Sequence, residues 1–553
     1  MGMRSQREKE DHVKKALQVR SSVLLLLASL LLVPCRGLEA AESAVVTILH
    51  VNDTHSHLDP LGPRTPALAG TVGGVARAAT VIARERAAAP NALFLHAGDA
   101  IITDPTFNAF VGVPAYEVLG MLGTDAFTYG NHEFDLGPGV LGETMLKQAA
   151  AFANVPLLGT NLENLSAVPS IQARTKSWIV KEVDGVRVGI FGLTIPDMPD
   201  ARPEPLAIGS DTVKAARAAL EEMRQAGAEV FVHLSHLGIQ GDRELVRAVA
   251  GIDVVVGGHD HLLFTTPEVE TAPDGKKVPI LQAGSYFRYV GRLRFTVKDR
   301  AFRLVDYRAI PVDDSIPADP KVDAFVESLH PKIVAAYGDL FRTTLGSTGQ
   351  ALANTFEPGS FRRDTSLGNL IADAYRNYTK TEIALTSLAM LSDAIPAGPI
   401  VGLDVFRAVG YGYDPATGLG FRLATCRISG ESLLNALKLV LVIGGSAEAV
   451  LPQTSGLTYA YNGKAEAAQG IVERSVFVNG RPLDLSRSYT LTSNEFVFEL
   501  IGKFVKLEDV VILPGAYEYT VLKQEIERQG TVRSLSWGRI VDVAAGFDSV
   551  ATE

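Results

Sequence analysis

The amino-acid sequence predicts a two-domain α/β protein. A chain of 553 residues is too long for a single hydrophobic core. Apolar, strand-like runs alternate with helical stretches from about residue 45 to residue 312, and a second α/β region follows a short Pro-rich segment. Apolar residues make up 47% of the chain and charged residues 21%, as in ordinary globular proteins. The net charge of −10 argues against a nucleic-acid-binding protein.

Residues 1–40 are predicted to be an export signal. A basic stretch precedes an apolar run from Ser21 to Val33, which is too short to span a bilayer comfortably, and Leu38-Glu39-Ala40 fits a cleavage site. The expected location is therefore the periplasm or the cell surface, and the alternatives are an uncleaved anchor or a lipid on Cys35. No later segment is apolar for about 18 residues without a charge, so no membrane span is expected after signal removal.

Residues 44–312 form the first predicted domain, in which apolar runs indicate strands and apolar residues at helical spacing indicate helices. The expected strands are Val45–Leu49, Ala92–Leu95, Ala126–Tyr129, Val186–Leu193, Glu229–Val232 and Asp253–Val256, followed by a strand pair, Val278–Gln282 and Gly291–Val297. The expected helices are Gly73–Ala88, Pro114–Leu122, Gly139–Ala153, Thr212–Gln225 and Asp242–Val249. Ligands of such a domain gather at the C-terminal ends of its strands.

Residues 313–340 are predicted to link the domains. They begin with a short acidic, Pro-rich segment and continue as a helix over Lys321–Leu340. The second domain, residues 341–553, is expected to contain helices near Ser366–Thr379 and Ser432–Val442. Cys426 is the single cysteine left after signal removal, so no intramolecular disulfide is expected and the residue is predicted to be buried.

Five apolar runs of the first domain end in residues that bind metal ions. Asp53 and His55 are separated by one residue, as are His259 and His261, so on an extended segment each pair would point the same way. Mixed nitrogen and oxygen ligands favour zinc, manganese or iron over calcium or a thiolate site. The predicted ligands are Asp53, His55, Asp99, Asn131, His236, His259 and His261.

The loop Tyr129–Asp135 is the densest of these stretches. Gly130 is expected to let the backbone turn tightly before Asn131, His132 and Asp135. His236 is preferred over His233 as a ligand because His233 lies inside the preceding strand. His50, His96 and His330 are expected to be structural, and His57 is not assigned.

These motifs resemble a known family. Asp53-x-His55, Gly98-Asp99, Gly130-Asn131-His132-Glu133, His236 and Gly258-His259-x-His261 are similar to the signature of calcineurin-like metallophosphoesterases. The stretches Asn52–Leu58 and Asn131–Asp135 resemble the 5′-nucleotidase family, which includes UDP-sugar hydrolases and 2′,3′-cyclic phosphodiesterases. The resemblance implies a four-layer αββα metallophosphoesterase domain, a linker helix and an α/β 5′-nucleotidase C-terminal domain.

The resemblance also implies roles for the predicted site residues. Two divalent ions (Zn, Mn or Fe) would share Asp99, and hydroxide formed at the ions would attack phosphorus in a small phosphate ester. His132 would stabilise charge on the phosphoryl or leaving oxygens, and Asp135 would orient it. The first ion would be held by Asp53, His55, Asp99 and His261, and the second by Asp99, Asn131, His236 and His259.

The second domain matches the family less closely. Arg363 matches a substrate-binding arginine, with a structural ion pair as the alternative, and Tyr411 and Phe496 match an aromatic clamp for a base, with burial in the core as the alternative. The usual Asn-Gly-Gly-Gly-Ile-Arg turn is replaced by the segment 386–392, and the usual Gly-Gly-Asp-Gly by the segment 500–503. A phosphate-ester hydrolase is therefore better supported than a preference for nucleotides.

The leading hypothesis is an exported dinuclear-metal phosphohydrolase acting on nucleotides, nucleotide sugars or cyclic nucleotides. One alternative is a SoxB-like thiosulfohydrolase, because the altered C-terminal pocket needs no base clamp. The other alternative is a non-catalytic binding protein on the same scaffold, against which the His132–Asp135 pair and the full set of predicted ligands argue.

Overall fold

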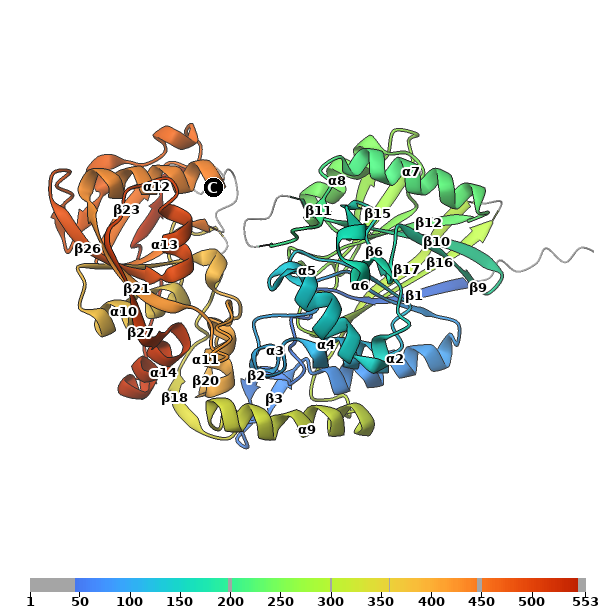
Figure 1. The fold of residues 1–553 in the computed structure, drawn as a ribbon, viewed down its shortest axis with the longest axis horizontal. Helices are drawn as coiled ribbons and strands as arrows, with labels where there is room; N and C mark the ends of the chain where they lie inside the picture. The colour runs from blue at the N-terminus through green and yellow to red at the C-terminus, as the bar shows by residue number, and fades with distance from the viewer. Residues whose placement is uncertain (1–44, 197–200, 299–300, 358, 445–449, 546–553) are drawn as a thin grey trace, which may run out of the picture.

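The computed structural model describes residues 45–196, 201–298, 301–357, 359–444 and 450–545, and the predicted signal with Cys35 lies outside them. Figure 1 shows two domains side by side, the N-terminal one in blue to green and the C-terminal one in orange to red. Helix α9, Pro320–Tyr337, runs along the lower edge and leads from one domain to the other. Among the described residues, no helix is both long and apolar enough to cross a bilayer.

The N-terminal domain is built on two β-sheets. The first has the order β17-β16-β1-β4-β5-β6-β8, with bounds Ala301–Pro311, Tyr289–Lys298, Val45–Val51, Leu93–His96, Ala126–Thr128, Leu157–Leu158 and Thr175–Lys176. The second has the order β14-β15-β13-β12-β10-β9, with bounds Glu268–Thr271, Lys277–Leu281, Val254–Val256, Val230–His236, Val186–Thr194 and Trp178–Val183. Adjacent strands β1, β4 and β5 are parallel, as are β10, β12 and β13.

Side chains alternate between the two faces of each strand, and this alternation produces four layers. Val46 and Ile48 of β1 point into a core between the sheets, whereas Leu49 and Val51 pack on the outer side, in the core that contains the buried face of helix α2, Val75–Ala88. Helices α7, Thr212–Gln225, and α8, Gly238–Ala248, pack on the outer face of the second sheet. The predicted αββα architecture is therefore confirmed.

The predicted pairing of Val278–Gln282 with Gly291–Val297 is wrong. The corresponding strands lie in different sheets, because β15 pairs with β13 and β14, whereas β16 pairs with β1 and β17. Between them the chain crosses from one sheet to the other through a turn in which Tyr286 and Phe287 have positive φ angles of 59° and 55°. A short connection without a helix permits this crossing as readily as a hairpin.

The predicted helix Gly139–Ala153 is broken into three pieces, α5 (Gly137–Val140), a π-helical turn (Leu141–Leu146) and a 3₁₀ turn (Ala150–Phe152). Glycines lower helix stability here. Gly142 also packs so closely that a Cβ would lie 2.3 Å from Ser170 Oγ. The remaining short elements of this domain are β2 Leu61–Arg64, β3 Gly70–Val72, α3 Pro105–Phe110, α4 Val113–Met121, β7 Leu162–Glu163, α6 Pro169–Gln172 and β11 Ala207–Ile208.

The C-terminal domain contains a five-stranded sheet. Its order is β22-β19-β26-β21-β27, with bounds Pro452–Ser455, Ile383–Ser387, Ser488–Asn494, Arg422–Ser429 and Glu508–Tyr517. The helices are α10 Ser366–Thr379, α11 Gly402–Ala408, α12 Gly430–Gly444, α13 Glu495–Ile501 and α14 Glu518–Gln529. Smaller sheets hold β18 Thr344–Thr348, β20 Gly398–Val401 and β28 Thr531–Val532, and β23 Leu457–Tyr461, β24 Phe477–Val478, β25 Arg481–Pro482 and β29 Ile540–Asp542. Cys426 on β21 is buried, as predicted.

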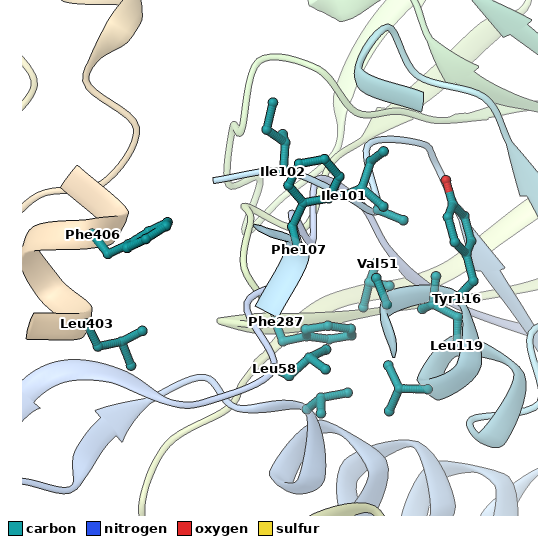
Figure 2. Close-up of a cluster of buried hydrophobic side chains, with 14 of the residues drawn as sticks. Val51, Leu58, Ile101, Ile102, Phe107, Tyr116, Leu119, Phe287, Leu403 and Phe406 are labelled. Carbon is teal, nitrogen blue, oxygen red and sulfur yellow. The ribbon is translucent and has the colours of Figure 1, made fainter. Parts of the chain in front are cut away.

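The two domains share a hydrophobic interface. Leu403 and Phe406 of helix α11 belong to the same buried cluster as Leu58 and Phe107 of the N-terminal domain (Figure 2). Next to them, Arg407 is only 1% exposed and its Nε donates to Asp104 Oδ2 across the interface at 2.7 Å. This packing fixes the C-terminal domain beside the strand ends that carry the predicted ligands.

Candidate metal centre and substrate cavity

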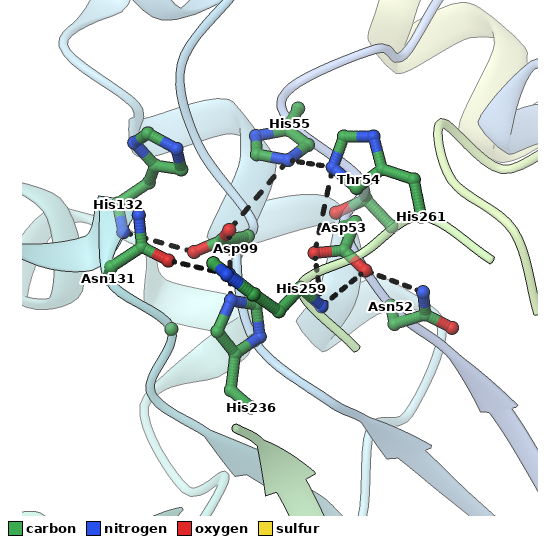
Figure 3. Close-up of polar contacts among 12 residues, drawn as sticks. Asn52, Asp53, Thr54, His55, Asp99, Asn131, His132, His236, His259 and His261 are labelled. Carbon is green, nitrogen blue, oxygen red and sulfur yellow. Dashed lines mark hydrogen bonds and ion pairs between the residues drawn. The ribbon is translucent and has the colours of Figure 1, made fainter. Parts of the chain in front are cut away.

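The predicted ligands come together at one edge of the N-terminal sandwich. They follow or end strands β1, β4 and β5 of the first sheet and β12 and β13 of the second. Within each sheet these strands run parallel to one another, so their C-terminal ends meet. Figure 3 shows the side chains converging from these separate loops. They form two three-residue clusters, Asp53, His55 and His261, and Asp99, His236 and His259.

The first cluster consists of side chains that approach one another through their ligand atoms. His55 Nε2 lies 3.0 Å from His261 Nε2, and His261 Nε2 lies 3.8 Å from Asp53 Oδ1. Asp53 is also fixed from outside the cluster, because its carboxylate accepts from the backbone N–H of His259 at 3.0 Å. The carboxylate therefore ties the β1 loop to the β13 loop.

The second cluster surrounds Asp99. Asp99 Oδ2 lies 3.0 Å from His236 Nε2 and 3.9 Å from His55 Nε2, so this carboxylate stands between the two clusters. Asn131 Oδ1 lies 3.2 Å from His259 Nδ1, which brings the amide into the same cluster. The positions agree with the predicted sharing of Asp99 between two sites.

The donor set fits two divalent metal ions. His55 Nδ1 lies 3.0 Å from the carbonyl oxygen of Ile101 and His236 Nδ1 lies 2.7 Å from that of Ala97; a carbonyl only accepts, so both Nδ1 atoms carry the proton. Each Nε2 then faces the cluster, which is how ligand histidines are oriented. Separations of about 3 Å are those of neighbouring ligands on an ion with bonds of about 2.1 Å.

The local backbone differs from the expected extended form. Asp53, His55, His259 and His261 have φ angles of 51°, 46°, 82° and 58°, in the left-handed region. Asp53 and His55 still face one cluster, because both adopt this conformation in a tight turn and not because they alternate along a strand. His259 and His261 do not point the same way as expected, since His261 belongs to the first cluster and His259 to the second. Backbone strain of this kind gathers at functional sites.

Gly130 has a different role from the predicted one. Its φ is not positive, and a Cβ there would lie 2.1 Å from Asp99 Oδ1, so the glycine is needed for close approach of the carboxylate. Gly98 has a φ of 87°, and a Cβ there would lie 2.5 Å from His236 Nδ1. Both glycines make room for ligand side chains.

Burial and neighbouring charge set the protonation of the ligands. Burial lowers the pKa of His55 to about 4, which keeps the imidazole neutral and able to bind a metal ion. Burial alone would raise the pKa of Asp99, but the imidazoles of His236 and His132 hold it well below its ordinary value. The Asp99 carboxylate is therefore ionised.

Two further residues position the ligands and were not assigned from the sequence. The Glu133 carboxylate accepts from the backbone N–H groups of Asp99, Ala100 and Gly130 at 2.9, 2.8 and 2.6 Å, which joins the β4 and β5 loops. Asn52 donates to Asp53 Oδ2 at 2.6 Å. Both residues lie inside the motifs that resemble the phosphoesterase family. Their positions next to predicted ligands in the sequence could have identified them.

His132 and Asp135 form the predicted pair. His132 Nδ1 lies 2.9 Å from Asp135 Oδ2, and the backbone N–H of His132 donates to Asp99 Oδ1 at 3.0 Å. Both side chains line a cavity of about 580 Å³ that also reaches Asp99, Asn131 and the His259 loop. The backbone contact thus ties the loop that carries the pair to Asp99.

Two of the predicted substrate-binding residues line the same cavity. Tyr411 lies with its ring 5.8 Å from the His132 ring, and Phe496 stacks on Phe421 with ring centroids 5.2 Å apart. Phe421 was not predicted from the sequence. Arg363 is not among the residues that line this cavity; it lies 3.9 Å from Asp542 Oδ2 and over the Phe356 ring. Its part in substrate binding remains a prediction.

The unassigned and structural histidines are also placed. His233 stacks on Phe191 with ring centroids 4.7 Å apart, away from the clusters. His57 is buried and stacks on Tyr286 at 4.0 Å, beside His55. His330 lies 2.9 Å from Asp59 Oδ1.

Comparison with known proteins identifies both domains. The profile of calcineurin-like phosphoesterases matches residues 46–263, and that of the 5′-nucleotidase C-terminal domain matches residues 346–508. The 5′-nucleotidase of Bos taurus is 30% identical over 358 residues, which is 61% of this chain and 61% of that protein's own length. The snake venom 5′-nucleotidase of Naja atra is 26% identical over 90% of this chain and 98% of its own.

A solved structure extends the comparison to the fold of both domains. The 5′-nucleotidase precursor from Thermus thermophilus has a TM-score of 0.78 and 29% sequence identity, covering 90% of this chain and 99% of that one. The sheet architecture, the two metal-ligand clusters and these similarities agree with one another. The chain belongs to the 5′-nucleotidase family, with a calcineurin-like phosphoesterase domain followed by a 5′-nucleotidase C-terminal domain.

Proposed function

We propose that the chain is a metal-dependent phosphohydrolase that releases phosphate from nucleotides or related phosphate esters. The observation that carries this proposal is the position of Asp99, whose Oδ2 lies 3.0 Å from His236 in one cluster and 3.9 Å from His55 in the other. Two divalent ions, when bound, would withdraw charge from the phosphoryl group and lower the pKa of water. The proteins named 5′-nucleotidase among its relatives support the same reaction class.

The residues of the chain supply orientation and charge. The Asp135 carboxylate accepts the Nδ1 proton of His132 at 2.9 Å, which fixes the ring against the cavity. A histidine held in this way stabilises negative charge that develops on the phosphoryl or leaving oxygens. Asp99 helps to hold this loop, because its Oδ1 accepts from the His132 backbone.

Phosphate release by the purified chain tests the proposal. AMP, a UDP-sugar, a 2′,3′-cyclic nucleotide and an aryl phosphate would be supplied with Mn²⁺, Zn²⁺ or Fe²⁺ in turn, with a chelator as the control. We expect phosphate release that depends on the metal and is lost with the chelator. If every ester stays intact with every metal and under one equivalent of metal is bound, the chain is a binding protein instead.

We also propose that the chain acts after export, in the periplasm or at the cell surface. The basic stretch and short apolar run within residues 1–40 support this location. N-terminal sequencing of protein recovered from the secreting host would reveal processing near Ala40. A mature chain that keeps residues 1–40 and stays in the cytoplasm would contradict the proposal.

A further inference from the structure

The cavity beside the metal centre changes in chemical character from one domain to the other. Its charged lining residues, Asp99, Asp135, Arg202 and Asp260, all belong to the N-terminal domain. Among the described lining residues, the C-terminal domain contributes no charged side chain. Its part of the wall consists mainly of aliphatic side chains, including Leu385, Met390, Ile428, Leu437, Val440 and Leu500.

The apolar part, which we term the apolar chamber, reaches into the core of the C-terminal domain. Ile428 on β21, Leu491 on β26 and Leu437 on α12 line it, and the first two are 1% and 0% exposed. The whole cavity of about 580 Å³ lies within the range of about 300–1,000 Å³ that is typical of small-molecule sites. Wall atoms around a void lose their packing partners, and a bound apolar chain would restore them.

Two segments that stand out in the sequence both contribute to this wall. The segment 386–392 supplies Ala389 and Met390, and the segment 500–503 supplies Leu500 and Ile501. These are the positions at which the sequence lacks an arginine turn and an acidic turn. Apolar side chains therefore line the wall in both places, next to Thr386 and Ser387 in the first.

Such a chamber would bind a nucleoside weakly. Its sugar hydroxyls and base edges lose hydrogen bonds to water on entry and need polar partners in return. In the C-terminal wall, the polar side chains are limited to Thr386, Ser387, Tyr411 and Tyr413 among the described residues. An alkyl or polyisoprenoid chain needs no polar partners.

We propose that the apolar chamber binds the single hydrocarbon chain of an amphiphilic phosphate monoester whose phosphate lies at the metal centre. This inference rests on the proposed function, under which that monoester is the substrate. In the reaction, the oxygen of water forms a new bond to phosphorus and the bond from phosphorus to the alcohol oxygen breaks. One proton of the water passes to the alcohol oxygen, giving a long-chain alcohol and hydrogen phosphate, with no change of oxidation state.

A series of n-alkyl phosphates with two to ten carbons tests the inference in the metal-loaded protein, below the micelle concentration. Each methylene that enters the chamber should raise kcat/KM about fourfold, which corresponds to about 0.8 kcal/mol. Hexyl phosphate should therefore exceed ethyl phosphate by about 100-fold or more. A kcat/KM that does not change with chain length, or AMP cleaved in preference to decyl phosphate, would overturn the inference. Either result would leave the proposed phosphohydrolase function intact.

A variant that fills the chamber supplies the second test. Ala436 lines the chamber from helix α12, whereas its neighbour Asn435 is exposed and does not line it. Ala436→Phe should lower the ratio of decyl to ethyl phosphate activity at least tenfold, by about the burial of two methylenes. The matched control Asn435→Phe should keep the wild-type ratio, and an equal loss in both variants would contradict the assignment.

Binding measured without turnover separates the two proposals. Calorimetry with ethyl and decyl phosphonate, which are not hydrolysed, should give tighter binding of the longer chain, and Ala436→Phe should remove the gain. If this gain is found while no ester is hydrolysed, the chamber binds a chain but the proposed function fails. If binding is independent of chain length, the chamber assignment fails whatever the activity.

Discussion

The buried ion pair between the domains allows a quantitative prediction. Arg407 is 1% exposed, donates from Nε to Asp104 Oδ2 at 2.7 Å and from Nη2 to the Asp59 carbonyl at 3.1 Å. Arg407→Met keeps most of the apolar volume but leaves the Asp104 carboxylate buried without its cation. Removal of one partner from a buried pair costs about 3–5 kcal/mol. The free energy of unfolding should fall by that amount.

Urea unfolding at constant metal concentration measures the loss, and Arg243→Met provides the matched control. Arg243 makes the same Nε contact with Glu268, at 2.5 Å, but both side chains are about one-third exposed, so its loss should cost about 1 kcal/mol or less. The double variant Arg407→Met with Asp104→Asn should recover part of the stability, because the buried charge is gone. Equal, small losses in Arg407→Met and Arg243→Met would refute the reasoning.

Three further predictions concern pH, catalysis and metal binding. Burial raises the pKa of Glu518 from 4.5 to about 7, so the folded chain keeps a proton that the unfolded chain releases between these pH values. The stability that protonated Glu518 contributes should therefore be lost as pH rises from about 4.5 to about 7, by up to about 3 kcal/mol, and urea titrations at pH 4.5, 6 and 8 should give a shallower slope for Glu518→Gln than for the wild type. His132→Ala should lower kcat about 10²–10⁴-fold while elemental analysis finds the wild-type metal content, whereas loss of metal would mean a structural role. Gly130→Ala should displace Asp99, because the new Cβ would lie 2.1 Å from its Oδ1, and elemental analysis should find less bound metal; an unchanged content would contradict the steric argument.

The sequence was sufficient to predict the layers and the convergence of the ligands. Strand and helix periodicity placed α7 and α10 at their observed bounds, and polar residues at the ends of apolar runs marked a common edge of parallel strands. Periodicity does not indicate which strands pair with one another, and that depends on packing in three dimensions. The sheet to which β16 belongs depends on the turn at Tyr286 and Phe287, which carries no repeating signal.

The apolar character of the cavity could not be predicted from local sequence patterns. Ile428, Leu437 and Leu500 lie on different elements, and each is an ordinary core residue when considered alone. The positive φ angles at the ligand turns have no signal in the sequence pattern. Glu133 joins two loops, because it accepts from the nearby Gly130 and from Asp99 and Ala100, which are distant from it in the chain. These features can be recognised only in the folded structure.

The shared carboxylate is tested most directly by the number and proximity of bound ions. Protein loaded with Mn²⁺ should contain two equivalents per chain by elemental analysis and give the electron paramagnetic resonance signal of two interacting ions. Asp99→Ala should lose metal and this interaction together, because Asp99 Oδ2 lies between His236 and His55. One equivalent in the wild type, or two non-interacting ions that persist in Asp99→Ala, would contradict a dinuclear centre joined by this residue.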